Sequence, residues 1–306
     1  MSLMVECKLA ITRALGPNRW NDVLQKGGWS KFKKKYLEIA TQVKTNEQFK
    51  NKYCGERCFI IGNGPSLKTQ DLTWLGSEYV FTCNQIMRNP IYPSLKSNFH
   101  FFADPTFFEL KKESSADMEV LELMRRINTE GNSPVCFFAT EGYGFSKEFE
   151  LDKELDLHYF AHRLEFTDEY DSELQFERFV PNLHTVVHYA IAMAIYMGFK
   201  EIYLVGCDCT NVVTAVNTRL RDGNGAEYAY EISQNEKDRM QQRNSKIMME
   251  DELKSFSEVF RAYRLFGEYC AKRGINLVNC TNGGLLDSLP RKKYEEVINQ
   301  KNEIRK

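Results

Sequence analysis

The stretch GNGPSL at residues 62–67 follows directly after the apolar run CFII at residues 58–61. Gly62 and Gly64 tolerate positive φ angles, and Pro65 suits the first turn of a helix. We therefore expect a buried strand, a tight turn and a helix start in immediate succession. Amides at such a helix start can hold an anion, and the Asn63 side chain can read a base or ribose. The stretch predicts an anion-binding loop, with a simple tight turn as the alternative.

The better-known nucleotide motifs do not fit this loop. The sequence has no GxxxxGK[ST] pattern and therefore no Walker lysine, and GNGPSL lacks the third glycine of GxGxxG. Both ATP hydrolysis of the P-loop type and ordinary NAD binding are disfavoured.

Short apolar runs recur along the chain, separated by stretches with helical spacing. They are CFII (58–61), YVFTCN (79–84), NFHFFAD (98–104), VCFFAT (135–140), EIYLVGCD (201–208) and INLVNCT (275–281). Strands that are apolar on both sides and alternate with helices indicate a mainly parallel sheet covered on both faces. The expected fold is a Rossmann-like α/β/α architecture of three layers.

Small polar residues stand where these runs end. Asn84, Asp104 and Asp208 each close a run, as Asn63 and Ser66 do in the first loop. In a doubly wound sheet the ligand lies beyond the carboxyl ends of the strands. The pattern therefore predicts one pocket, lined by Gly62, Asn63, Gly64, Ser66, Asn84, Asp104 and Asp208.

A helix is predicted to begin near residue 185, in the sequence HTVVHYAIAMA at residues 184–194. Thr185 stands at its N-terminus, where it either receives a second phosphate oxygen or acts as a plain N-cap. His188 lies one turn inside and is expected to pack in the core. His184, at the mouth of the site, is the better acid/base candidate.

Composition limits the class of protein. The 306 residues are 42% hydrophobic and carry a net charge of −1, which gives no reason to expect nucleic-acid binding. Nine cysteines without zinc-like spacing indicate reduced thiols in a cytoplasmic protein, with the pairs Cys54/Cys58 and Cys207/Cys209 as less favoured metal ligands. No run approaches the roughly 20 apolar residues of a membrane span.

The chain divides into a catalytic domain with appendages at both ends. Residues 1–53 read as a helical appendage, whose basic tract KFKKKY at 31–36 suits either a membrane surface with a lipid-linked acceptor or a solvated helix face. Residues 54–290 form the predicted catalytic domain, and residues 291–306 a helical tail that frays. The polar stretches 142–182 and 209–250 are candidate lids.

Five segments together resemble a known group of proteins. They are IIGNGPSL (60–67), TCNQ (82–85), MGFKEIYLVGCD (197–208), EYAYE (227–231) and NCTNGGLL (279–286). They resemble the bacterial sialyltransferases of lipooligosaccharide loci, which use CMP-sialic acid. They resemble equally the 6-hydroxymethylpterin diphosphokinase MptE-like proteins (domain of unknown function 115), a group that includes the motility accessory factor glycosyltransferases. The resemblance covers about residues 56–290.

The sialyltransferase resemblance implies roles for particular residues. Asn63 and Gly64 would contact the ribose and phosphate of the nucleotide, and Asn84 the cytidine nucleotide. Thr185 would lie by the phosphate or donor sugar, Asp208 by the cytidine or ribose, and Tyr228 by the leaving phosphate. No metal is needed in such enzymes, because tyrosine hydroxyls and helix amides stabilise the departing CMP.

Two departures from that pattern matter. Asp104-Pro105 stands where the sialyltransferases have Asn-Pro, so its carboxylate would have to take ribose hydroxyls or a metal. The histidine that serves those enzymes as base should precede the helix ending near Lys272, but no histidine follows His188. We expect His184 to act as base, with Asp208 or Glu227 next.

These features leave three functions open. We favour transfer of a sialic acid or related nonulosonic acid from a CMP-activated donor to a surface-glycan or lipid-linked acceptor, as in lipopolysaccharide biosynthesis, with no cofactor required. The alternative is diphosphate transfer from ATP to a pterin alcohol, which needs Mg²⁺. Asp104 and Asp208 would then hold the metal, and Lys68 and Arg88 could assist. The third is a noncatalytic nucleotide-binding protein. A peripheral membrane contact and a homo-oligomer are both compatible with the sequence.

Overall fold

The computed structural model describes residues 36–128, 132–220, 229, 231, 233–234, 237–238 and 247–304. The chain forms two compact units, Met1–Gln42 and Val43–Lys306. The described part of the first unit, residues 36–42, is helical. The second unit begins at Val43, whereas the sequence placed this boundary after Tyr53, because Val43 and Phe49 are buried apolar residues of the second unit.

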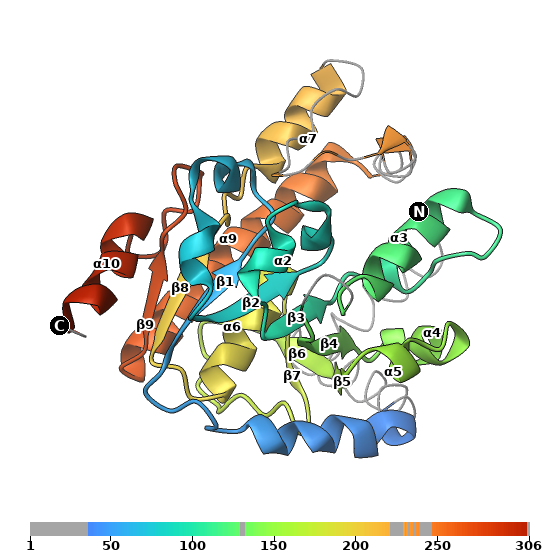
Figure 1. Cartoon of the computed structure of the whole chain (residues 1–306), viewed down its shortest axis with the longest axis horizontal. Helices are drawn as coiled ribbons and strands as arrows, with labels where there is room; N and C mark the ends of the chain where they lie inside the picture. The colour runs from blue at the N-terminus through green and yellow to red at the C-terminus, as the bar shows by residue number, and fades with distance from the viewer. Residues whose placement is uncertain are drawn as a thin grey trace, which may run out of the picture. The chain divides into compact units, whose positions relative to one another are not determined.

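A parallel sheet of seven strands, in the order β5-β4-β3-β2-β1-β8-β9, organises the second unit (Figure 1). A small parallel sheet pairs β6 with β7. The strands are β1 (Arg57–Ile61), β2 (Tyr79–Cys83), β3 (Phe99–Phe102), β4 (Val135–Ala139), β5 (Leu157–Phe160), β6 (His162–Glu165), β7 (Val180–Asn182), β8 (Glu201–Val205) and β9 (Asn276–Asn279). The Rossmann-like α/β fold predicted from the sequence is therefore confirmed.

Helices connect these strands and cover the sheet. The α-helices are α2 (Tyr92–Leu95), α3 (Ser115–Arg125), α4 (Gly142–Glu148), α5 (Leu151–Glu154), α6 (Val186–Tyr196), α7 (Asn211–Leu220), α9 (Met249–Lys272) and α10 (Tyr294–Ile304). The 3₁₀ helices are η1 (Thr45–Phe49), η2 (Pro65–Thr69), η3 (Leu72–Leu75), η4 (Ile86–Arg88) and η5 (Pro105–Phe107). Among the described helices, none is long and apolar enough to cross a membrane.

One face of the sheet packs against α6 and α9. Alternate strand residues such as Ile60, Phe81 and Phe101 point to this face and share one apolar core with both helices. The two helices touch where the ring of His188 on α6 meets that of Tyr263 on α9, at a centroid distance of 4.3 Å. Each fully buried large side chain of this kind contributes about 1.5–3 kcal/mol to folding.

The opposite face is covered by the C-terminal helix and by the short helices that follow β1 and β2. The ring of Phe59 packs against Tyr294 of α10, and His100 packs against Tyr92 of α2. Tyr294 and Val297 are buried, so the start of the predicted fraying tail is part of this layer.

The prediction that residues 142–182 are a candidate lid was wrong. They contain β5, the edge strand of the main sheet, and the β6–β7 sheet. The β6–β7 connection lies on α9, where Asp168 pairs with Arg261 at 2.8 Å and with Arg264 at 2.6 Å. Phe166 beside it packs on Phe266. The polar residues of this stretch therefore fix it to a helix.

Candidate functional site

The order of the strands marks the position beside β1 as the expected ligand site. From β1 the chain adds β2, β3, β4 and β5 on one side, and it later adds β8 and β9 on the other. Ligands of open α/β sheets bind at the carboxyl ends of the strands where the order reverses. Here this point lies between β1 and β8, so the segments that follow them, residues 62–67 and 206–209, form the centre of the candidate site.

Both glycines of the first loop allow the backbones after β1 and β8 to approach closely. Gly62 N donates to Val205 O at 2.8 Å, and Gly64 N donates to Gly206 O at 2.9 Å. A Cβ atom on Gly64 would lie 1.8 Å from Asp208 Oδ2. Gly64 has a φ of −70°, so its tolerance of positive φ angles is not used, and close approach is the physical reason for glycine.

Asp208 holds the start of η2. Its Oδ1 accepts from Ser66 N at 3.1 Å and its Oδ2 from Ser66 Oγ at 2.7 Å. The side chain is buried, and this burial raises the pKa of the carboxyl. The amides of Gly62, Gly64 and Ser66 are thus committed within the fold. The loop offers fewer free amides to a phosphate than its sequence suggested, and it adds a carboxylate beside them.

Two asparagine side chains present acceptors at the ends of β1 and β2. Asn63 Nδ2 donates to Cys83 O at 3.0 Å, which fixes the orientation of the amide because a carbonyl can only accept. Among the described residues, neither Asn63 Oδ1 nor Asn84 Oδ1 has a hydrogen-bond partner, and both atoms are buried. A buried carbonyl oxygen without a donor costs about 1–3 kcal/mol. Both oxygens are therefore suited to receive hydrogens from a ligand.

Part of the segment predicted as a lid lies against this loop. Ala229 N donates to Asn63 O at 3.3 Å, and Ala229 is buried. Most of residues 221–246 lie outside the described residues. Those include Tyr228, the predicted partner of the leaving phosphate, and Glu227, one of the alternative bases.

Helix α6 points its N-terminus at the same edge of the sheet, because it leads directly into β8 and so runs antiparallel to the strands. Thr185 is its N-cap and accepts from His188 N at 3.3 Å. His188 is fully buried, as the sequence predicted, and burial lowers its pKa to about 3. His188 is therefore a neutral core residue and a poor base.

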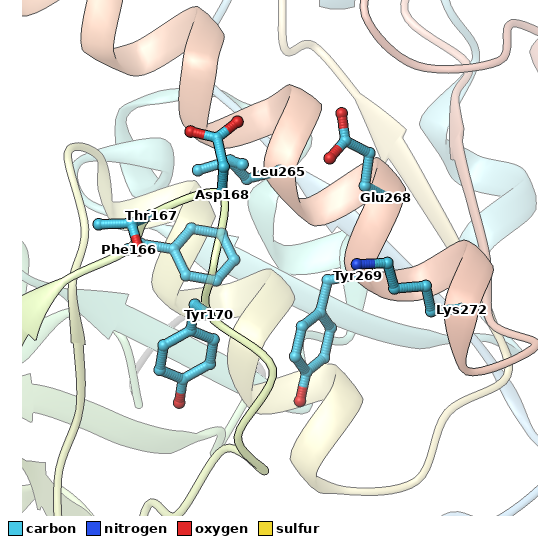
Figure 2. Close-up of a pocket in the computed structure, with 8 residues that line it drawn as sticks. All are labelled: Phe166, Thr167, Asp168, Tyr170, Leu265, Glu268, Tyr269 and Lys272. Atoms are coloured by element: carbon cyan, nitrogen blue, oxygen red, sulfur yellow. The ribbon is translucent and has the colours of Figure 1, made fainter.

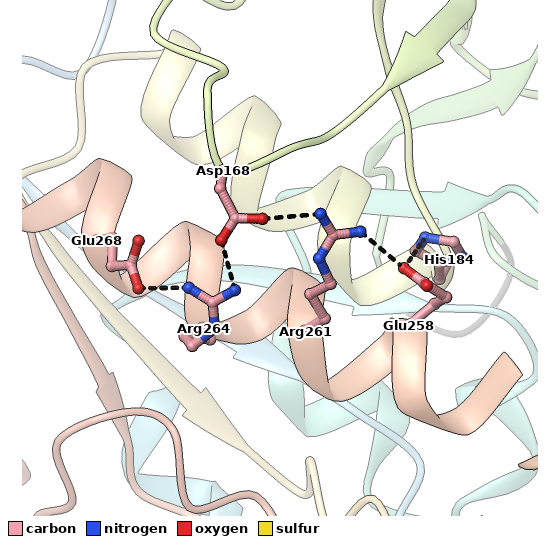
Figure 3. Close-up of polar contacts among 6 residues, drawn as sticks. All are labelled: Asp168, His184, Glu258, Arg261, Arg264 and Glu268. Atoms are coloured by element: carbon pink, nitrogen blue, oxygen red, sulfur yellow. Dashed lines mark hydrogen bonds and ion pairs between the residues drawn. The ribbon is translucent and has the colours of Figure 1, made fainter. Parts of the chain in front are cut away.

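His184 lies next to this N-cap, with 34% of its side chain exposed. Its Nε2 is 3.9 Å from Glu258 Oε2 on α9, and Glu258 also pairs with Arg261 at 3.2 Å (Figure 3). A histidine beside a carboxylate at the mouth of a site can accept a proton from a substrate hydroxyl. The role of His184 as base remains a prediction.

The remaining sequence candidates have local partners. Asp104 caps η5, because its Oδ1 accepts from Thr106 N at 3.0 Å and from Thr106 Oγ1 at 2.8 Å. Arg88 pairs with Glu119 of α3 at 2.8 Å. Lys68 is exposed on η2. The three residues follow three different strands, Lys68 after β1, Arg88 after β2 and Asp104 after β3.

Sequence reasoning missed Arg291, which belongs to the stretch expected to form the tail. Its guanidinium donates to Leu286 O at 2.9 Å, to Thr281 O at 2.7 Å and to Gly283 O. The loop so held reaches Asp208, because Leu285 N donates to Asp208 O at 2.7 Å. Only the run of Asn and Gly at 282–284, which needs an external partner for its carbonyls, hinted at such an arginine.

A small pocket lies elsewhere, between the β6–β7 connection and α9 (Figure 2). Its lining residues are Phe166, Thr167, Asp168, Tyr170, Leu265, Glu268, Tyr269 and Lys272. Because α9 leads into β9 and runs antiparallel to it, its last turns lie toward the amino ends of the strands. This pocket is therefore separate from the candidate site.

Comparisons with known proteins identify the family and related folds. The family model described as 6-hydroxymethylpterin diphosphokinase MptE-like matches residues 31–213. The solved structure of the MAf glycosyltransferase from Magnetospirillum magneticum AMB-1 is similar, with 12% identity and a TM-score of 0.45 over 87% of this chain. The chain spans 41% of that protein's length. No curated protein sequence matches this chain.

A second similar structure is the sialyltransferase CstII from Campylobacter jejuni in complex with the substrate analogue CMP-3FNeuAc. It is 22% identical, with a TM-score of 0.47, and the match covers 77% of this chain and 86% of that one.

Proposed function

The chain belongs to the 6-hydroxymethylpterin diphosphokinase MptE-like family, and we propose that it is a glycosyltransferase that uses a CMP-activated sugar. The donor we infer is a sialic acid or related nonulosonic acid, transferred to a hydroxyl of a surface glycan or lipid-linked acceptor. The reaction would take place in the cytoplasm. A homo-oligomer and a peripheral membrane contact remain part of this proposal.

The observation that carries the proposal is the pair of buried amide oxygens, Asn63 Oδ1 and Asn84 Oδ1. Amide oxygens accept hydrogen bonds and do not donate them, so they favour hydroxyl or amino groups over phosphate oxygens. A nucleoside supplies both, through its ribose hydroxyls and the amino group of cytosine. We infer that the nucleoside part of the donor lies at the ends of β1 and β2.

The transfer requires a base for the acceptor proton and groups that stabilise the departing phosphate. The acceptor oxygen forms a bond to the anomeric carbon while the bond from that carbon to the CMP phosphate oxygen breaks, and the electron pair leaves with CMP. His184 Nε2 would take the acceptor proton, with Glu258 stabilising the charged imidazole. The amides of the first turn of α6, and Tyr228, would stabilise the departing phosphate.

The family description also supports diphosphate transfer from ATP to a pterin alcohol, which requires Mg²⁺. Magnesium prefers carboxylate and water oxygens. Asp208 uses both its oxygens on Ser66, and Asp104 uses Oδ1 on Thr106. Across the described ranges, no three His, Cys, Asp or Glu residues gather as a metal site would require. Asp104 and Asp208 therefore do not fit the metal, and we favour a metal-independent reaction.

Calorimetric titration with CMP, CDP, ATP and GTP, each with and without Mg²⁺, tests the proposal. We expect CMP to bind without metal, and Asn63→Ala to weaken that binding by about 1–3 kcal/mol because a buried hydrogen bond is lost. Asn276→Ala is the matched control, because Asn276 is an exposed asparagine at the amino end of β9, away from the candidate site. Magnesium-dependent binding of ATP would favour the diphosphokinase, and no nucleotide binding would leave a noncatalytic protein.

A further inference from the structure

A buried histidine outside the site makes hydrogen bonds through both ring nitrogens. His100, on β3, has no exposed surface. Its Nδ1 lies 2.7 Å from Thr82 Oγ1 on β2, and its Nε2 lies 3.0 Å from the backbone oxygen of Asn84. Thr82 Oγ1 is in turn 2.7 Å from Ser97 Oγ. This polar chain lies on the face of the sheet opposite α6, among rings such as those of Tyr92 and Phe102.

The partners determine where the protons are. A carbonyl oxygen only accepts, so Nε2 must carry the hydrogen that it shares with Asn84 O. Burial lowers the pKa of His100 to about 3, so the ring is neutral and Nδ1 is an acceptor. Thr82 therefore donates to Nδ1, and Ser97 donates to Thr82 or to Phe99 O, which lies 3.0 Å from Ser97 Oγ. The Asn84 carbonyl thus fixes the tautomer of His100, and the ring in turn fixes the direction in which Thr82 donates.

The series of hydrogen bonds ends at Asn84, whose side-chain oxygen has no partner among the described residues. Asn84 has a φ of +49°, a conformation that a residue with a side chain adopts at some cost. Strand β3 holds both of its backbone groups, because Asn84 N donates to Phe101 O at 2.9 Å and Asn84 O accepts from His100. These two bonds fix the direction in which the Asn84 side chain leaves the backbone.

We propose that His100 is a positioning residue that, through the carbonyl oxygen of Asn84, holds the Asn84 amide in place for the nucleotide. This inference rests on the proposed function. A purely structural histidine would need only to fill its space among aromatic rings, where an apolar side chain avoids the desolvation of three polar groups. The polar chain instead ends on the one left-handed residue of the site loop after β2.

Two conservative variants separate the nitrogens. In His100→Gln the side-chain amide reaches about the position of Nε2, so it still donates to Asn84 O. In His100→Asn the shorter amide lies near the position of Nδ1 and leaves that carbonyl without a donor. We expect CMP to bind His100→Gln within about threefold of the original chain, and His100→Asn about tenfold more weakly.

Phe138→Leu is the control, because Phe138 is equally buried on the neighbouring strand β4, packs on Phe102 beside His100 and has no polar side-chain group. Its CMP affinity should not change even if its thermal stability falls. Equal loss of affinity in His100→Gln and His100→Asn, or loss that follows thermal stability across all three variants, would overturn the positioning role.

Hydrogen exchange of the peptide spanning residues 82–88 gives a readout that needs no ligand. We expect its amides to exchange faster in His100→Asn than in His100→Gln, because Asn84 is released from β3. If no nucleotide binds the original chain, the proposed function fails, and this exchange difference still decides whether His100 holds Asn84. Unchanged exchange in His100→Asn would refute the inference.

Discussion

At the scale of single residues, the contact between Gly64 and Asp208 makes the clearest prediction. In Gly64→Ala the new Cβ would lie 1.8 Å from Asp208 Oδ2 and 2.7 Å from Gly206 O, so the loop has to move away from β8. We expect a loss of about 2–4 kcal/mol in unfolding free energy, as for other overpacked or strained core positions, together with loss of CMP binding. Urea unfolding and calorimetry measure the two effects.

Gly144 provides the matched glycine. It lies in α4, and a Cβ there would meet nothing within 4 Å. Gly144→Ala should leave CMP binding unchanged and raise the stability by about 0.5–1 kcal/mol, because alanine favours a helix over glycine. An unaffected Gly64→Ala protein would mean that the loop is not held against Asp208.

The positions of the site residues could be read from the sequence, but their contacts could not. Asn63, Asn84 and Asp208 follow apolar runs, and the topology of a parallel sheet brings such positions to one edge. That Asp208 caps η2 depends on a register between β1 and β8 that no local pattern reveals. His100 gave no hint of its role, because a histidine inside an apolar run looks like any core residue.

At the scale of elements, a buried ion pair joins β1 to the turn before β2. Arg57 Nε and Nη2 donate to Glu78 at 3.0 and 2.8 Å, and Nη1 donates to Val297 O on α10 at 3.1 Å. The Glu78 side chain is only 4% exposed. Arg57→Met would leave this carboxylate buried without its cation, and we expect a loss of about 3–5 kcal/mol.

A double variant shows whether that loss comes from the stranded charge. Arg57→Met combined with Glu78→Met removes both charges, and its stability measured by urea unfolding should recover most of the loss. A double variant that is as unstable as Arg57→Met alone would indicate that the bond to α10, and not the ion pair, is what matters.

The sequence analysis did not predict strands β5, β6 and β7. Strand β5 (Leu157–Phe160) is four residues long and follows a charged helix, so its period could not be recognised. A residue distant in the sequence holds this strand in place, because Asn46 Nδ2 donates both to Tyr159 O in β5 and to Phe176 O. The runs that became β1, β2, β3, β4, β8 and β9 were each apolar enough to be predicted to within two or three residues.

At the scale of the whole molecule, alternation of strands and helices predicted the layers, while the order of the strands came only from the structure. The order reverses at β1 because β8, the strand after α6, pairs with the edge of β1 that is opposite β2. The apolar residues of β8 do not show which strand edge it joins. One neutral histidine is fully buried on each face of the sheet, His100 on the face toward α2 and His188 on the face toward α9.

Those two histidines make the stability of the molecule depend on pH. In the folded chain both have a pKa of about 3, against 6.5 for the exposed group, so the unfolded chain binds their protons first. Their contribution is fully present above about pH 6.5 and is lost as the pH falls from there toward 3. Each lowers the unfolding free energy by about 1.4 kcal/mol per pH unit well inside that window.

Urea unfolding at pH 7, 6 and 5 measures this slope. Burial also lowers the pKa of His158, so this third histidine adds to the slope, whereas burial raises the pKa of Asp208, which opposes the slope near the usual carboxyl range. Asp168 has a pKa of about 2 and matters only below its usual range near 4. We expect His188→Phe to reduce the decline between pH 6 and 5 by about 1 kcal/mol, because one of the proton-binding sites is gone. A stability that stays constant down to pH 5 would mean that both rings reach solvent in the folded chain.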